Sequence, residues 1–261
     1  MFLDVVDLRD FYSGELGRVV QPILAGHVRK IWPQVSGDRV LGIGFATPYI
    51  GQFSGEAERV IAFMPSTQGA VNWPTGGPNA VSLVVEDMLP LPDASVDRVV
   101  LVHALEMVND PEGMLKEIWR VLSPGGRMLA IVPNRRGLWA RVDTSPFGYG
   151  RPYSRRQLTN LLRQTMFSPN GWDEALYMMP VPRQRFLKSG ARWEKVGARL
   201  WPAFAGVIMV EATKHLYQGI PNIRRLKVAE PIRPVLLPAP LPTPHREGIN
   251  VPTAGTPPAW R

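Results

Sequence analysis

Hydrophobic and polar positions follow a helical spacing near the start of the chain. Apolar residues recur there every three or four positions, which is the spacing of one face of an α-helix. They are Leu16, Val19, Val20, Ile23, Leu24, Val28 and Ile31. This pattern predicts a helix that tolerates Pro22 or kinks there and ends before Trp32.

Short apolar runs then alternate with helical patterns. Runs at 39–43, 59–63, 80–85, 98–102, 127–132 and 205–211 predict strands. Asp110 as an N-cap, followed by Pro111, predicts a helix that stops at the SPGG sequence of 123–126. A second helix is expected to begin at Ser154, where Gln157 completes a capping box and Leu158, Leu161 and Leu162 face inward.

Strands separated by helices predict the α/β class, with a mostly parallel, doubly wound sheet and helices on both faces. We expect this folded domain to span residues 1–228. Residues 229–261 contain nine prolines, which exclude a helix or a central strand. That segment is predicted to be an extended, proline-rich, disordered tail.

The amino-acid composition limits the cellular compartment and the types of site that we expect for this protein. None of the 261 residues is cysteine, which excludes disulfides, thiol catalysis and cysteine-ligated metals and favours a reducing compartment. The apolar runs are shorter than the roughly 20 residues of a membrane span, and the first ten residues do not resemble a signal peptide. The four histidines lack metal-ligand spacing. We therefore expect a cytoplasmic protein without membrane contact or metal.

The net charge of +8 is concentrated in one part of the chain. Between positions 127 and 156 the only acid is Asp143, and seven arginines are present: Arg127, Arg135, Arg136, Arg141, Arg151, Arg155 and Arg156. Such a surface attracts anions, and nearby aromatic residues suit flat anionic ligands. The alternative is a solvated surface without a ligand. Nucleic acid is disfavoured because the sequence shows no separate recognition module.

A glycine-containing loop follows the first predicted strand in the sequence RVLGIGFATPYIG at 39–51. In a doubly wound sheet, ligands bind beyond the carboxyl ends of the strands, and glycine lets the backbone approach them closely. The G-x-G-x-x-G pattern of nicotinamide and flavin enzymes fails here at Thr47, which disfavours an oxidoreductase.

Residues 84–134 carry a longer combination of motifs, VVEDMLPLPDASVDRVVLVHALEMVNDPEGMLKEIWRVLSPGGRMLAIVPN. Together with the glycine loop, this stretch resembles the class I S-adenosylmethionine-dependent methyltransferases, in particular the methyltransferase type 11 group. The late sequence AGVIMVEATK is similar to the reversed final strand of that fold. The resemblance implies a Rossmann-like, seven-stranded sheet with an antiparallel last strand, and S-adenosylmethionine as the cofactor.

The same resemblance assigns positions in the cofactor loop. Gly44 matches the first glycine of the family's loop, whereas Ala46 and Pro48 stand where further glycines are usual. Gly42 takes the position that the family usually gives to an acid at the end of the first strand. The loop therefore departs from the family pattern at three positions.

The position implied for the ribose contact departs from the family pattern, whereas the position implied for the adenine contact matches it. Met64 stands where the family presents a carboxylate to the ribose, which forgoes hydrogen bonds of about 1.5–3 kcal/mol each. Asp87 matches the acid near the adenine amino group. The cofactor-contacting residues implied by the resemblance are Gly42, Gly44, Phe45, Ala46, Met64, Pro65, Asp87, Met88 and His103.

Methyl transfer from a sulfonium is a direct displacement, so alignment of the two reactants supplies most of the rate effect and a general base is optional. His103 and Glu106 are the candidates for such a base. Residues beyond the fifth strand commonly cover the acceptor, and here they are Arg135, Arg136, Trp139 and Tyr153.

The sequence thus predicts an S-adenosylmethionine-dependent methyltransferase that acts on a small-molecule acceptor, anionic or aromatic in character. One alternative is a non-catalytic scaffold that binds a protein partner through the arginine-rich face or the tail. Under this alternative, Phe45, Pro48 or Met64 fills the cofactor site. Another alternative keeps the cofactor for different chemistry, because the fold does not fix the reaction.

Overall fold

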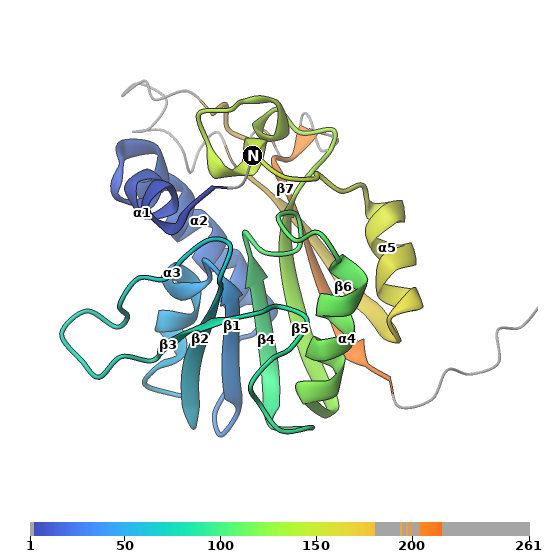
Figure 1. Ribbon diagram of the computed structural model, residues 1–261. Coiled ribbons are helices and arrows are strands. Elements are labelled where there is room, and N and C mark those ends of the chain that lie inside the picture. The colour runs from blue at the N-terminus through green and yellow to red at the C-terminus, as the bar shows by residue number, and fades with distance from the viewer. Residues whose placement is uncertain (1–2, 181–193, 195–196, 198, 200–203, 216–261) are drawn as a thin grey trace, which may run out of the picture. The chain divides into compact units, whose positions relative to one another are not determined.

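The computed structural model describes residues 3–180, 194, 197, 199 and 204–215. Its strands form one seven-stranded sheet in the order β3-β2-β1-β4-β5-β7-β6 (Figure 1). They are β1 Arg39–Gly44, β2 Arg59–Pro65, β3 Val81–Val84, β4 Val96–Val102, β5 Leu122–Pro133, β6 Phe167–Ala175 and β7 Val207–Lys214. Strands β1 to β5 run parallel, and β7 runs antiparallel to β5 and β6. The predicted fold class is confirmed.

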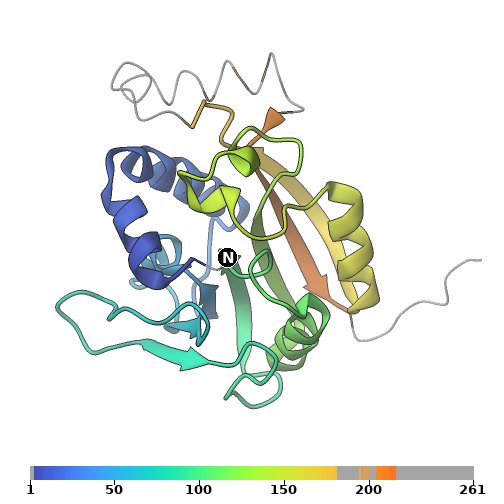
Figure 2. The ribbon, with the colours of Figure 1, turned by 45° about the horizontal axis from the view of Figure 1, so that its top comes forward.

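Helices cover both faces of the sheet, as predicted (Figure 2). The α-helices are α1 Val5–Ser13, α2 Glu15–Ile31, α3 Thr47–Ile50, α4 Pro111–Val121 and α5 Arg155–Gln164. Short 3₁₀ turns occur at η1 Gly51–Phe53, η2 Trp139–Arg141 and η3 Pro146–Gly148. Side chains of α1, α2 and α3 share one apolar layer, and those of α4 and α5 share the other.

Local sequence explains where the predicted helices begin. The Asp110 carboxylate accepts a hydrogen bond from the Gly113 amide, so α4 has the expected N-cap. Helix α5 has the capping box of Ser154 and Gln157. These side chains satisfy amides that have no partner in the first turn of a helix. Pro22 lies inside α2, which continues past it to Ile31.

Strand β6 and helix α1 were not predicted. Strand β6 contains Pro169, Asn170 and Gly171, which are typical of turns, and its pairing with β7 shifts register between Pro169 and Gly171. Helix α1 precedes the predicted α2 and has Asp4 as its N-cap, with Val5, Leu8 and Tyr12 on its buried face. The predicted tail at 229–261 lies outside the described residues.

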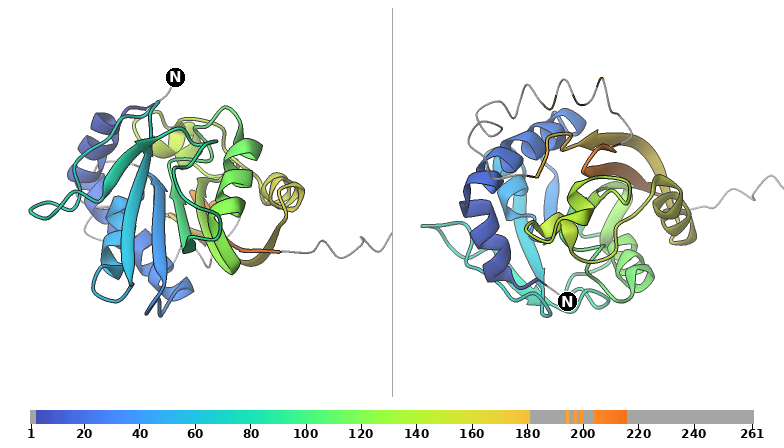
Figure 3. Two further views of the ribbon diagram at one scale, coloured as in Figure 1. Left: turned by 60° about the horizontal axis from the view of Figure 1, so that its bottom comes forward. Right: turned by 90° about the horizontal axis from the view of Figure 1, so that it is seen from above.

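Alternation along the central strands produces the two apolar layers. In β1, Leu41 and Ile43 face α4 and α5, whereas Val40 faces α1 and α2. Successive side chains of a strand point to opposite faces, so a strand covered on both sides is apolar throughout. The edge beyond β2 is less covered: Leu83 and Val85 are each 54% exposed and Met88 is 75% exposed (Figure 3, left).

Within the described ranges, no helix is long and apolar enough to cross a membrane. The same part of the chain contains no group of three or more histidine or acidic side chains placed to hold a metal ion.

Candidate functional site

The candidate site lies at the carboxyl ends of β1, β2 and β4, where the direction of the strand order reverses (Figure 3, right). Gly44 ends β1 with a φ of 80°. A Cβ atom there would lie 2.3 Å from the Val102 carbonyl oxygen, and the next amide, of Phe45, donates to that oxygen over 2.8 Å. Glycine is therefore required because the loop crosses the end of β4 at very close range.

The loop then enters a very short helix. Ala46 is buried and precedes α3, which is a single turn with Pro48 near its start; proline is well tolerated at that place. A Cβ atom on Gly42 would lie 2.7 Å from the Ile50 Cδ1 atom and 2.8 Å from the Ala46 Cβ atom. The space that a carboxylate at position 42 would need is thus occupied by apolar side chains.

The residues assigned to the ribose and the adenine lie in different environments. Met64 is buried at the end of β2, and its sulfur accepts a hydrogen bond from the Val71 amide. Pro65 is also buried, and its carbonyl accepts from the Gln68 and Gly69 amides. Asp87 and Met88 lie on the exposed surface after β3. The nine assigned residues therefore do not form one open pocket in this conformation.

Aromatic rings fill the space beside the loop. The Tyr12 ring stacks on the Phe45 ring, with centroids 5.4 Å apart and an angle of 17° between planes. The Tyr49 ring meets Tyr12 edge-on at 6.0 Å, and the Phe147 ring lies 4.8 Å from the His103 ring. All five side chains are buried. The N-terminal helix α1 thus places a tyrosine against the loop that the family resemblance assigns to the cofactor.

A chain of hydroxyl groups links this cluster to His103. The Tyr49 hydroxyl donates to the Tyr12 oxygen over 2.8 Å, and the Tyr12 oxygen lies 2.9 Å from His103 Nε2. Burial raises the pKa of Tyr12 well above its usual range and also raises that of Tyr49. Both hydroxyls therefore keep their protons at neutral pH. Because the Tyr49 hydroxyl donates to its oxygen, Tyr12 can in turn donate to Nε2 when that nitrogen carries no hydrogen.

His103 and Glu106 contain polar atoms without partners. His103 Nδ1 lies 3.3 Å from Glu106 Oε1, but that nitrogen and both carboxylate oxygens are buried and form no hydrogen bond within the described part of the chain. His103 has a φ of 50°, which is uncommon for a residue with a side chain, and its carbonyl accepts from Gln68 Nε2. Unpartnered buried polar atoms are costly and therefore mark a candidate site.

The residues assigned to the acceptor are divided between surface and core. Arg135 and Arg136 are exposed. Tyr153 is partly buried, donates its hydroxyl hydrogen to the Leu105 carbonyl oxygen, and has a pKa raised to about 12 by burial. Trp139 is fully buried, and its indole nitrogen donates to the Met178 carbonyl oxygen over 2.8 Å. Trp139 is therefore part of the core in this structure, and its assignment to the acceptor stays a prediction.

Sequence reasoning missed the contribution of α1. The signal was present: Val5, Leu8 and Tyr12 follow helical spacing after Asp4, a residue that commonly caps helices. Tyr49 and Gln68 were also missed, and their local sequence contains no motif that links them to His103. Their roles depend on distant parts of the chain meeting at one edge of the sheet.

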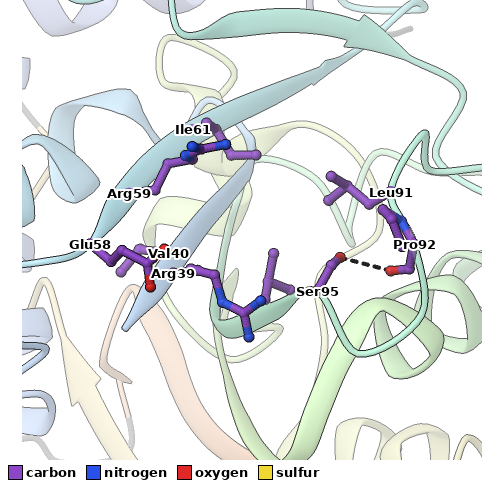
Figure 4. Close-up of a pocket in the computed structure, with 9 residues that line it drawn as sticks. Arg39, Val40, Glu58, Arg59, Ile61, Leu91, Pro92 and Ser95 are labelled. Carbon is purple, nitrogen blue, oxygen red and sulfur yellow. Dashed lines mark hydrogen bonds between the residues drawn. The ribbon is translucent and has the colours of Figure 1, made fainter. Parts of the chain in front are cut away.

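A hollow lies at the opposite end of the strands, near the amino ends of β1, β2 and β4 (Figure 4). Its volume is about 340 Å³, and its lining includes Arg39, Glu58, Arg59, Ile61 and Ser95. None of the residues assigned from the sequence to cofactor or acceptor lines it.

Comparison with known proteins links the candidate site to a family. Residues 41–130 match the family model described as a methyltransferase domain. A relative in Mycolicibacterium smegmatis, named as a probable S-adenosylmethionine-dependent methyltransferase, is 42% identical over 81 residues. That match covers 30% of this chain and 31% of the relative's length, so the chain matches about a third of the relative.

Solved structures agree in fold. An S-adenosylmethionine-dependent methyltransferase of Thermotoga maritima aligns over 81% of this chain and 96% of its own, with 18% identity and a TM-score of 0.55. One from Mesorhizobium loti aligns over 72% and 96%, with 15% identity and a TM-score of 0.54. Residues 41–130 therefore resemble a methyltransferase domain, and the fold of the chain is similar to that of S-adenosylmethionine-dependent methyltransferases of known structure.

Proposed function

We propose that the protein is an S-adenosylmethionine-dependent methyltransferase that acts on a small-molecule acceptor. One observation carries the proposal. The family match at 41–130 includes β1, β2, β4 and the residues that follow them, and the unpartnered buried atoms of His103 and Glu106 lie at this same edge. The segment that defines the family is therefore also the segment that builds the candidate site.

The residues at this edge fit the cofactor unevenly. Asp87 is exposed and forms no ion pair among the described residues, so its carboxylate is available to the adenine amino group. The imidazole of His103 and the carboxylate of Glu106 have unused hydrogen-bonding capacity near the loop. Met64 provides an apolar wall but no carboxylate for the ribose. We infer that these residues hold S-adenosylmethionine with lower affinity than the usual set would.

When bound, the cofactor supplies an electrophilic methyl group on a positively charged sulfur. The task of the chain is to exclude water and to orient the acceptor, and this accounts for most of the rate enhancement that such a displacement needs. The buried aromatic rings around Phe45 and His103 supply a water-free wall. No charged nucleophile from the protein is required.

The surface around the site supports an acceptor with negative charge. Arg135, Arg136 and Arg141 are exposed between β5 and α5 and have no side-chain partner within the described residues. Arg155, by contrast, pairs with Glu174. Unpaired guanidinium groups attract carboxylates and phosphates and hold them with paired hydrogen bonds.

Calorimetric titration of the full chain with S-adenosylmethionine and S-adenosylhomocysteine tests the proposal. We expect saturable binding and thermal stabilisation, and we expect Asp87→Ala to weaken binding about tenfold. Glu58→Ala is the matched control, because Glu58 is an exposed acid at the opposite end of the strands. The Glu58→Ala variant should bind S-adenosylmethionine with the affinity of the wild type.

The same titration separates the proposal from a non-catalytic scaffold. Phe45 and Met64 are buried in the assigned site, which is also what a scaffold without cofactor would show. Absence of heat and of thermal stabilisation at millimolar ligand would overturn the methyltransferase proposal.

A further inference from the structure

Tyr12 occupies a space that matches a phenol in shape. Its ring lies flat on Phe45 at 5.4 Å, and the rings of Phe11 and Tyr49 meet it edge-on at 5.1 and 6.0 Å. Aromatic rings are held well by one stacked and several edge-on neighbours. Phe11 belongs to α1 itself. The other rings of the cluster come from the segments that follow β1, β4 and β5, and they are Phe45, Tyr49, His103 and Phe147.

The polar contacts of Tyr12 also match a phenol. Its hydroxyl group meets one acceptor, His103 Nε2 at 2.9 Å, and one donor, the Tyr49 hydroxyl at 2.8 Å. A neutral imidazole nitrogen that accepts a hydrogen bond from an O–H group is also placed to receive that proton. The Tyr12 hydroxyl, which keeps its own proton, therefore shows the hydrogen-bond geometry that a bound phenol would adopt toward His103.

Glu106 completes this arrangement on the other side of the imidazole. Its carboxylate lies 3.3 Å from His103 Nδ1, and its two oxygens form no hydrogen bond in the described structure. When Nε2 takes up a proton, the imidazole becomes positively charged and the nearby carboxylate stabilises it.

A phenol could enter this space only if α1 moved and withdrew Tyr12, and the connections of α1 define how it would move. Gly14 separates α1 from α2 as a single extended residue. At its other end, α1 is tied to the sheet edge by the Val5 amide, which donates to the Gln68 carbonyl oxygen over 2.7 Å. Rotation at Gly14 would withdraw Tyr12 while Phe45, Tyr49 and His103 stay on the sheet. The space left behind would keep the wall, the donor and the acceptor that a phenol needs.

We propose that the methyl acceptor is a phenol that takes the place of Tyr12, with its ring on Phe45 and its hydroxyl on His103 Nε2. This inference rests on the proposed methyltransferase function. In the transfer, the phenol O–H bond breaks and the proton goes to His103 Nε2. The phenol oxygen then forms a bond to the methyl carbon, while the carbon–sulfur bond breaks and its electron pair stays on sulfur. The products are an aryl methyl ether, S-adenosylhomocysteine and one proton, which His103 releases to solvent.

Ligand binding to Tyr12→Gly in the full chain tests the complementarity of this space. 4-Methylphenol reproduces the Tyr12 side chain, and 4-methylanisole has the same ring but no O–H group to donate. We expect 4-methylphenol to bind Tyr12→Gly at least tenfold more tightly than 4-methylanisole and to raise its melting temperature. Tyr12→Phe, which keeps the ring in place, is the matched control and should bind neither. Equal binding of the two ligands would overturn the proposal.

The wild-type chain provides a test that does not depend on the folding of a variant. With S-adenosylhomocysteine present, 4-methylphenol should increase hydrogen exchange of the α1 amides, because the ligand displaces Tyr12, whereas 4-methylanisole should not. Incubation with methyl-labelled S-adenosylmethionine should yield labelled 4-methylanisole, and Glu106→Gln should slow this transfer at least tenfold at saturating S-adenosylmethionine.

The outcomes separate the two proposals. Binding of S-adenosylhomocysteine together with unchanged α1 exchange and no labelled ether would overturn the phenol inference and leave the methyltransferase function standing. Absence of S-adenosylhomocysteine binding would overturn the function, and the phenol inference with it.

Discussion

The two ends of strands β1 and β4 differ in how their polar groups are satisfied. At the amino end, Arg39 pairs with Asp97, whose carboxylate also accepts from the Ser123 hydroxyl, and Arg98 pairs with Asp38 over 2.8 Å. At the carboxyl end, His103 and Glu106 lie buried with unused hydrogen-bonding atoms. The same pair of strands therefore has one end that is electrostatically complete and one end that is not.

This difference separates stability from function. Paired charges at the amino end join neighbouring strands and lower the free energy of the fold, whereas a buried acid without a partner raises it. Proteins retain costly polar groups where chemistry or binding requires them. The contrast assigns the amino end to holding the sheet together and the carboxyl end to ligand chemistry, as is general for parallel α/β sheets.

The largest effect is expected at Gly44, where the carboxyl end is most crowded. In Gly44→Ala, the new Cβ atom would meet the Val102 carbonyl oxygen at 2.3 Å and the φ of 80° would be strained. We expect a loss of about 3 kcal/mol or more in the free energy of unfolding, measured by denaturant titration. Gly55→Ala is the control, because nothing lies within 4 Å of its Cβ position. A loss below 1 kcal/mol for Gly44→Ala would show that the loop relaxes easily.

An intermediate effect is expected at the amino end. The hydrogen bonds from Arg39 hold the pKa of Asp97 at about 2, below its usual value of 3.8. The ionised form is thus favoured by folding, so its stabilisation is complete above about pH 4 and is lost as the pH falls toward 2. Asp97→Asn should cost about 1–2 kcal/mol at pH 7, since the pair is partly exposed to water.

The pH dependence provides the check on Asp97. Denaturant titrations of the wild type and Asp97→Asn at several pH values should give free energies of unfolding that converge between pH 4 and pH 2. A difference that stays constant over this range would mean that the carboxylate of Asp97 is not the source of the stabilisation.

The sequence predicted the strands of the fold better than it predicted the site. Apolar runs and the N-cap at Asp110 are local signals, and the structure confirms them at β1, β2, β4, β5 and α4. Strand β6 was missed because its pairing with β7 overrides residues typical of turns. Local sequence is therefore sufficient to predict an element when pairing with a neighbouring strand does not override the preferences of its residues.

The site depends on contacts between distant residues, which no local pattern contains. Tyr12 meets His103 across 91 positions of the chain, and Gln68 meets the same residue across 35. His103 and Glu106 were named as candidates from their place after a strand, and the structure places them within 3.3 Å of each other. The burial of Trp139 could not be predicted, because its partner is the Met178 carbonyl oxygen, 39 residues away.

The smallest expected change in stability has the opposite sign to the others. Glu106→Gln replaces a buried, unpartnered carboxylate with a neutral amide of the same shape. We expect the free energy of unfolding at pH 7 to rise by about 1 kcal/mol. Glu56→Gln is the matched control, because Glu56 accepts hydrogen bonds from Arg29 and the Val35 amide, and this variant should lose stability. If both variants lost stability equally, Glu106 would have a partner in solution, and the contrast between the two ends of the strands would fail.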